Sequence, residues 1–432
     1  MSSLTVTLIL FSLLLLLLFL NVPLVVSIGL PTALIMLGSG MKVATLAQRT
    51  YASVDSFTLM AIPFFMLAGK LMEVGGMSKR IVRLADCLVG WMAGGLAHVI
   101  VVASAFFGAL SGSAAATTAA IGSTLIPEMK KRGYPADFVA GIQAVAGALG
   151  VIIPPSITMI MYGVCSSTSI GKLFMAGIVP GIVLALFLMV TIAYQAKKRK
   201  ISQMNTFTFK ELGAAFLDAI PALLVPTIIL GGIYGGIFTP TEAGALSAVY
   251  GIFYYLILWF VNKKAIKIDF LTIAAISGAS TAVIGLLNAF SVIAGKVITL
   301  TGVSGFLSNL ITQSISTKGG FLLMINILFL FMGTFMDINA TILIMTPLLL
   351  PVAMNAYGIT ALHFGAIMLV NMCVGFLTPP FAVGIFVGQK IAGATFTDTV
   401  KEAVPFIIVG LAAILVTTLC PGYLMFFVNL FT

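Results

Sequence analysis

Charged residues are scarce in this chain. Asp, Glu, Lys and Arg together make up 8% of its 432 residues, whereas hydrophobic residues make up 60%. Soluble domains carry about 25% charged residues. So little charge leaves no room for a large soluble domain, and the long uncharged stretches predict an all-α polytopic membrane protein.

The residues that build catalytic and metal sites are also rare. None of the four cysteines lies at C-x-x-C spacing, and neither His98 nor His363 has a partner at metal-ligand spacing. The chain has no P-loop, no nucleophile elbow and no H-E-x-x-H motif. These absences argue against an ATP-driven pump, an enzyme and a transition-metal site, so we expect no cofactor.

Positive charge is the exception, because the net charge is +10. The basic residues gather in four short segments, at 79–83, 130–132, 197–200 and 263–267. Such segments mark the cytoplasmic ends of membrane spans, so the charge predicts topology and lipid contact, with no nucleic acid partner. Residues 8–20 resemble a signal-peptide core, but the missing charged n-region and A-x-A site predict a retained span.

Two double prolines interrupt long apolar stretches, in GVIIPPS at 150–156 and GFLTPPF at 375–381. Proline removes a backbone donor and clashes with the carbonyl one turn earlier. Lipid offers no water to the freed carbonyls, so such breaks survive only where protein or a wet cavity covers them. Two breaks in matching places are typical of the central binding site of a transporter.

The sequence repeats itself at an offset of about 225 residues. Small residues and prolines recur in the same order; the matches include Gly108 with Gly333, Gly133 with Gly358, Gly150 with Gly375, and Pro154-Pro155 with Pro379-Pro380. Any one match is weak, but the common order indicates a duplication.

The charges indicate that the two copies are inverted. The segments 78–83 and 128–133 are basic, so we expect them to face the cytoplasm. Their counterparts, 301–318 and 355–363, contain a single Lys or Arg, Lys318, so we expect them to face the outside. Between the first two lie 41 residues, 87–127, with no charged residue and a small polar centre. Two membrane spans of about 20 residues each would use almost the whole segment and leave no residues for a turn between them. We therefore predict a re-entrant hairpin in each copy.

The repeat, the loop charges and the apolar stretches together divide the chain into six segments. We predict an amphipathic interfacial helix at 201–218. We also predict a last span at 404–429 that has no counterpart in copy one. The segments are 1–86, scaffold spans and the first long helix; 87–171, hairpin and broken helix of copy one; 172–262, return span, interfacial helix and scaffold spans; 263–302, long helix of copy two; 303–390, hairpin and broken helix of copy two; and 391–432, final span.

The hairpin tips and the breaks are the candidate ion site. Each break frees carbonyls, and sodium is a hard cation that accepts carbonyl and hydroxyl oxygens near helix C-termini. The alternative is that the glycines only permit close packing and the prolines only kink. The sodium candidates are Gly108, Ser111, Gly112, Ser113, Gly150, Val151 and Pro154 in copy one, and Gly333, Thr334, Gly375, Thr378 and Pro379 in copy two.

Four residues are candidates for substrate contact: Asp337, Lys296, Ser113 and Ser156. Asp337 is the only charged residue between 319 and 389, and an intramembrane carboxylate is costly unless it has a function. It can also be a helix cap. Lys296 can attract a substrate carboxylate or extend to the membrane interface.

Several runs resemble the large membrane subunit of tripartite ATP-independent periplasmic (TRAP) transporters, and the resemblance covers nearly the whole chain. They are SGSAAATTAAIG at 111–122, IPEMKKRGY at 126–134, GVIIPPSITMIMYG at 150–163, TPTEAGA at 239–245 and GTFMD at 333–337.

The resemblance implies import of organic acids across the bacterial inner membrane, driven by sodium, by an elevator movement of the hairpins and broken helices. It also implies a small membrane subunit and a soluble periplasmic substrate-binding protein. Because the chain begins directly with the large-subunit spans, we expect a separate small subunit. Asp337 and Lys296 favour sialic acid over a C4-dicarboxylate. Outer loops near Gly171, Thr239 and Asn355 are expected to dock the binding protein.

Three alternatives stay open. A stand-alone sodium/carboxylate symporter of similar architecture needs no partner. A passive channel needs a continuous polar path, whereas the polar residues here gather at two tips. An intramembrane enzyme needs a second buried acid near Asp337, and the sequence supplies none.

Overall fold

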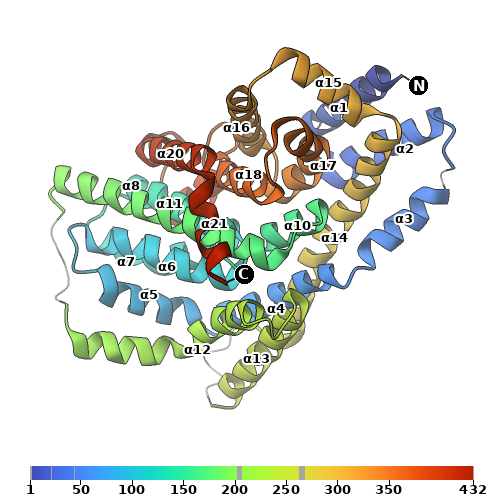
Figure 1. The fold of residues 1–432 in the computed structure, drawn as a ribbon. Helices are drawn as coiled ribbons and strands as arrows, with labels where there is room; N and C mark the ends of the chain where they lie inside the picture. Colours follow the sequence, from blue (N-terminus) through green and yellow to red (C-terminus); the bar gives the residue numbers. More distant parts are fainter. Residues whose placement is uncertain (1, 21, 43, 202–206, 262–267, 432) are drawn as a thin grey trace.

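The computed structural model describes residues 2–20, 22–42, 44–201, 207–261 and 268–431, and every regular element in these ranges is a helix (Figure 1). Three helices come before the first copy: α1 Ser3–Phe19, α2 Leu24–Gly38 and α3 Ala44–Val54. The basic segment 263–267 and residues 202–206 of the predicted interfacial helix lie outside the described residues.

The order of elements repeats, as the sequence predicts. Copy one comprises η1 Thr58–Met60, α4 Ala61–Val74, α5 Met77–Val89, α6 Gly95–Ser111, α7 Ala114–Lys131, α8 Ala136–Gly147, α9 Leu149–Ile152, α10 Ile157–Ser166 and α11 Ile170–Lys198. Next come α12 Phe209–Tyr234 and α13 Pro240–Val261. Copy two comprises α14 Phe270–Leu300, α15 Val303–Ser314, α16 Lys318–Phe335, α17 Ile338–Tyr357, α18 Ala361–Gly375, α19 Val383–Ala392 and α20 Phe396–Leu419, followed by α21 Pro421–Phe431.

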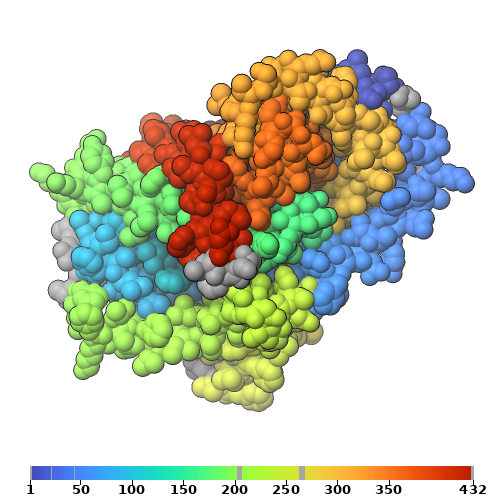
Figure 2. Space-filling model, in the orientation of Figure 1, coloured from blue at the N-terminus to red at the C-terminus, as the bar shows by residue number. Residues whose placement is uncertain are grey.

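The last span was predicted wrongly. Residues 404–429 belong to two helices, α20 and α21, which are separated at Cys420. Helix α20 follows α19 as α11 follows α10, so copy two does have a return helix. The extra element is α21, which lies across α11 on the face shown in Figure 2. Pro421 begins α21, and proline fits a first helical position because it needs no donor there.

The equivalent helices α4 and α14 run antiparallel. Thr281 Oγ1 contacts Met66 Sδ at 3.5 Å, and Asn288 Nδ2 donates to the Ser53 carbonyl at 3.3 Å. The later residue of α14 thus contacts the earlier residue of the α3–α4 segment, so the two run in opposite directions. Helix α3 lies beside α14 in Figure 1. This geometry confirms the inversion that the loop charges indicate.

The two copies interlock through their broken helices. Helix α19 of copy two packs on α7 and α8 of copy one, and α10 of copy one packs on α17 of copy two. Polar contacts join them: Lys130 Nζ donates to the Ala392 carbonyl at 2.6 Å, and Tyr162 donates its hydroxyl to the Ala361 carbonyl at 2.6 Å. Each distal half-helix is thus held by the other copy.

Seven helices in the described ranges are long and apolar enough to cross a membrane, or up to nine if each bent pair counts as one span. One bent pair joins α3 to residues 58–74 at an angle of 58°. The sequence did not predict a separate helix at the position of α3. The other is the predicted broken helix of copy one, α8–α9 with α10, bent by 42°.

Two predicted loops contain helices. Residues 78–83 belong to α5, which buries Ile81, Leu84 and Ala85 and exposes Lys79 and Arg83. Segment 301–318 holds the equivalent α15. Charge density alone suggested loops, but an amphipathic helix at an interface places basic residues on its polar side in the same way.

The interfacial helix and the following span are one element in the described residues. Helix α12 continues from Phe209 past Pro221 to Tyr234, so 201–218 is not a separate helix. Asp218, inside α12, accepts ion pairs from Arg80 at 3.7 Å and Arg83 at 3.4 Å. These pairs tie α12 to α5. Asp269 caps the N-terminus of α14, and hydrogen bonds from Thr272 hold the pKa of the Asp269 carboxyl below its usual value.

Candidate functional site

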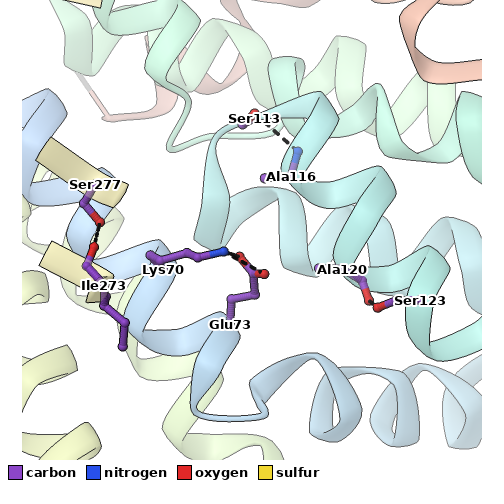
Figure 3. A network of polar contacts seen from close by, with 8 residues as sticks. All are labelled: Lys70, Glu73, Ser113, Ala116, Ala120, Ser123, Ile273 and Ser277. Carbon is purple, nitrogen blue, oxygen red and sulfur yellow. Dashed lines mark hydrogen bonds and ion pairs between the residues drawn. The ribbon is translucent and has the colours of Figure 1, made fainter. Parts of the chain in front are cut away.

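The first hairpin turns at Gly112 and Ser113. Gly112 ends α6 with a φ of 60°, a left-handed conformation that glycine adopts without strain. Ser113 begins α7, and its side chain accepts a hydrogen bond from the Ala116 N–H at 3.5 Å (Figure 3). Thr117 Oγ1 lies 2.9 Å from Ser111 Oγ and donates to the Ser113 carbonyl at 2.8 Å. The tip is therefore a compact cluster of hydroxyls and carbonyls.

The first break lies at the Pro154–Pro155 peptide, which is cis, between α9 and α10. Ser156 is 1% exposed, and its hydroxyl donates to the Val151 carbonyl at 2.7 Å. Thr158 Oγ1 lies 2.6 Å from the Ser156 hydroxyl. These side chains satisfy a carbonyl that the prolines leave without a helical donor.

Tip and break touch through backbone atoms. A methyl group built on Gly108 would lie 2.7 Å from the Gly150 Cα, and the Ile157 N–H donates to the Gly112 carbonyl at 3.3 Å. Any side chain larger than hydrogen would separate these backbones. The predicted meeting of tip and break in copy one is therefore confirmed.

Copy two repeats this arrangement with different polar groups. A methyl group on Gly333 would lie 2.9 Å from the Gly375 Cα. Asp337 begins α17, and its Oδ1 accepts hydrogen bonds from the N–H groups of Asn339 and Ala340 at 2.9 and 3.3 Å. Thr378 Oγ1 donates to the Val374 carbonyl at 2.8 Å. Asp337 therefore caps the N-terminus of α17, which is the alternative role that the sequence suggested for it.

Both tips and both breaks line one cavity of about 280 Å³. Hairpin residues Ser113 and Asp337 face it together with Thr158 from the first broken helix. Met66 of α4 and Ile284 of α14 close another side. Two hairpins that enter from opposite sides thus end at the same place, as the inverted repeat predicts.

Helix ends of both polarities surround this cavity. Four helices begin at its wall: α7 with Ala114, α10 with Ile157, α17 with Ile338 and α19 with Val383. Free N–H groups and the helix dipole make such N-termini attractive to anions. Helices also end there, because Val151, Gly333 and Thr334 lie in the last turns of α9 and α16. Their carbonyls favour a cation.

The predicted site residues divide into two groups. The residues that line the cavity are Gly112, Ser113, Val151, Gly333, Thr334 and Asp337. The others do not line it; they are Gly108, Ser111, Gly150, Pro154, Ser156, Gly375, Thr378, Pro379 and Lys296. Sequence reasoning missed the lining residues Thr158, Asn339, Phe376 and Phe381, although each is within a few residues of a predicted tip or break.

The two intramembrane lysines lie away from the tips' cavity. Lys70 forms an ion pair with Glu73 at 3.0 Å on α4, so its charge is neutralised locally (Figure 3). Lys296 follows Ile284 by twelve residues on α14, about 18 Å along the helix. It lines a second cavity of about 470 Å³. Direct contact of Lys296 with a substrate beside Asp337 is therefore not supported by this geometry.

A third cavity, of about 730 Å³, brings together two of the predicted outer loops. Gly171 and Lys172 line it from one side, and Gly236 and Pro240 line it from the other. Asn355 does not contribute. Within the described ranges, no group of three or more His, Cys, Asp or Glu side chains is placed to hold a metal ion.

A family model described as "Tripartite ATP-independent periplasmic transporter, DctM component" matches residues 8–423. The chain is 42% identical to an isethionate TRAP transporter permease, DctMQ, of Oleidesulfovibrio alaskensis; the match covers 94% of this chain but only 64% of that longer protein. It is 40% identical to the C4-dicarboxylate TRAP transporter large permease DctM of Pseudomonas aeruginosa, over 92% of each chain.

A sialic acid TRAP transporter large permease, SiaM, of Vibrio cholerae is 35% identical over 85% of this chain and 86% of that one. Among solved structures, the YdaH transporter of Alcanivorax borkumensis matches with a TM-score of 0.52 at 14% identity, over 88% of each chain. That likeness concerns the fold, a helical transporter architecture with broken helices.

Proposed function

The chain belongs to the DctM family, the large permease component of TRAP transporters in the bacterial inner membrane, and on that premise we propose that it imports an organic acid together with sodium. The family consists of transporter permeases rather than enzymes. The observation that carries the proposal is the single cavity in which helix N-termini and helix C-termini from both inverted copies meet.

An organic acid suits the N-terminal side of this cavity. Four helix N-termini supply partial positive charge, and no described lysine or arginine lines the wall. Ser113 and Asp337 already cap α7 and α17, so the N–H groups open to an acid are those of α10 and α19. Relatives are named for isethionate, C4-dicarboxylates, 2,3-diketo-L-gulonate and sialic acid, which all carry an anionic group. The preference for sialic acid loses one of its two supports, because Lys296 lies outside this cavity.

Sodium suits the C-terminal side. In copy one, Thr117 donates to the Ser113 carbonyl, and both of these oxygens lie against Gly150 at the break, 2.6 and 2.9 Å from a methyl group built there. In copy two, Thr334 donates to the Phe331 carbonyl of α16, and Thr378 in the break donates to the Val374 carbonyl of α18. Both hydroxyls keep oxygen lone pairs for an ion. We propose that each tip and its break hold a sodium ion, and that the glycine contacts between them form the packed state that the ion requires.

We further propose that transport needs a small membrane subunit and a periplasmic binding protein. Support comes from family membership and from the cavity of about 730 Å³ beside Gly171 and Pro240, where two predicted outer loops meet. In this scheme the hairpins and broken helices move as one elevator body against α12–α14.

A reconstituted system tests the proposal. Proteoliposomes holding this chain and its small subunit are supplied with binding protein and labelled isethionate, succinate, 2,3-diketo-L-gulonate or sialic acid. We expect saturable uptake of one of these acids, only with binding protein present and with an inward sodium gradient. Choline in place of sodium is the control. Uptake without binding protein would instead indicate a stand-alone symporter, and sodium-independent, non-saturable flux would indicate a channel.

A further inference from the structure

The second cavity holds two cations that lack partners among the described residues. Arg49 of α3 and Lys296 of α14 both line it, and no ion pair joins either of them to a carboxylate. Ser53, Ser291 and Cys165 also line it, and much of the remaining wall is apolar. No Asp or Glu of the described ranges lines this cavity. Two unpaired cations on one apolar-walled cavity attract an anion.

A buried hydroxyl in the same cavity also lacks a partner. Ser291 is 2% exposed, and its Oγ makes no hydrogen bond with any described residue. A buried hydroxyl without a partner is costly, and such groups are few in native proteins. One helical turn earlier, Asn288 is fully buried and donates to the Ser53 carbonyl at 3.3 Å, which holds α3 against α14 at this level. This hydrogen bond therefore fixes the relative position of the two helices that carry Arg49 and Lys296.

We propose that this cavity binds the anionic group of an organic acid before that acid reaches the central cavity. Arginine and lysine bind carboxylate and sulfonate groups through charge-assisted hydrogen bonds, so Arg49 and Lys296 together can hold such a group. The site deepens the proposed function, on which its role in transport rests.

The position of the cavity fits such a role. Helix α14 begins after the basic segment 263–267, which the charge pattern assigns to the cytoplasm, so Lys296 near its other end lies towards the outside. The central cavity contacts the same helix at Ile284, about 18 Å further inward. Val164, Leu343 and Pro347 belong to the broken helix and the second hairpin, so both the elevator body and α14 line the site.

Cys165 provides a local reporter, because it lines this cavity and is partly exposed. The test uses the full chain in phosphatidylcholine liposomes, with the other three cysteines replaced by serine. Cys165 is labelled with two methanethiosulfonates, one carrying a sulfonate and one carrying a trimethylammonium group. We expect the sulfonate reagent to react faster relative to its cationic counterpart, and this ratio to fall about tenfold or more in R49Q/K296Q.

Two further variants make the test specific. K318Q removes one exposed positive charge near the start of α16, outside the cavity, and should leave the ratio unchanged. T299C places a second reporter at an exposed position of the same wall, and should give the same charge preference if Cys165 reacts too slowly. A ratio that R49Q/K296Q does not alter at either reporter would overturn the proposal.

Competition identifies the anion. Millimolar succinate or isethionate should slow labelling in phosphatidylcholine liposomes if an organic acid binds here. If phosphatidylglycerol protects the reporter and the soluble anions do not, the site holds a lipid phosphate and the proposed role in transport is wrong. Labelling does not require transport, so this experiment can fail or succeed independently of the sodium-coupled uptake assay.

Discussion

The contact between Gly333 and Gly375 gives the sharpest test of how the second tip works. Each glycine lies so close to its partner that an added methyl group would stand 2.9 Å or 2.7 Å from the opposite Cα. The clash is with backbone, so no side-chain rotation relieves it. Overpacking of this kind costs about 1–3 kcal/mol.

We expect G333A to weaken sodium binding because the strain is relieved when tip and break separate. If sodium requires the packed state, a strain of about 1–3 kcal/mol lowers its affinity by about 5- to 150-fold. The measurement is the sodium dependence of initial uptake, together with the melting temperature of the purified protein with and without sodium. The half-saturating sodium concentration should rise, and the increase in melting temperature on adding sodium should become smaller.

Gly319 provides a matched control on the same helix. A methyl group there meets no atom within 4 Å, so G319A should leave sodium dependence unchanged and leave stability equal or slightly higher. The reasoning is refuted if G333A shows the sodium curve of the wild type while G319A is also neutral. In that case the close backbone approach has no part in ion binding.

Three further substitutions separate capping, ion binding and packing. D337N keeps a capping side chain and should abolish most uptake with unchanged melting, whereas D337A should also lose about 1 kcal/mol of stability; wild-type uptake by D337N would leave Asp337 as a cap only. T378A should raise the half-saturating sodium concentration by about tenfold, and an unchanged curve would remove Thr378 from the ion site. S156A should lower the melting temperature, since the Val151 carbonyl loses a buried donor worth about 1–3 kcal/mol; an unchanged melting curve would show that Thr158 Oγ1, 3.2 Å from that carbonyl, replaces it.

The sequence predicted the architecture well where covalent chemistry limits the choices. Proline cannot continue a spanning helix, so the breaks at Pro154–Pro155 and Pro379–Pro380 were visible without a structure. Glycines at a fixed offset predicted which tip meets which break, because only close backbone approach requires that residue at both positions. The inversion followed from loop charges and is confirmed by the antiparallel α4 and α14.

Side-chain placement was harder to predict. Lys296 and Asp337 are both rare charges in apolar surroundings, and sequence alone gives no reason to separate them; their separation depends on which turn of α14 meets the tips. The bend between α3 and α4 was missed because no proline marks it. Residues 404–429 were taken as one span because apolar character continues through Cys420, while the helix does not.

The exchange of half-helices between the copies has a consequence for the origin of this fold. Helix α10 packs on the second copy and α19 packs on the first, so neither copy alone completes the cavity or covers its own broken helix. A single ancestral unit could have formed the site only by pairing with a second, upside-down molecule of itself. The two halves differ at their tips, because the second tip carries the acid Asp337 whereas the first carries Ser111 and Ser113.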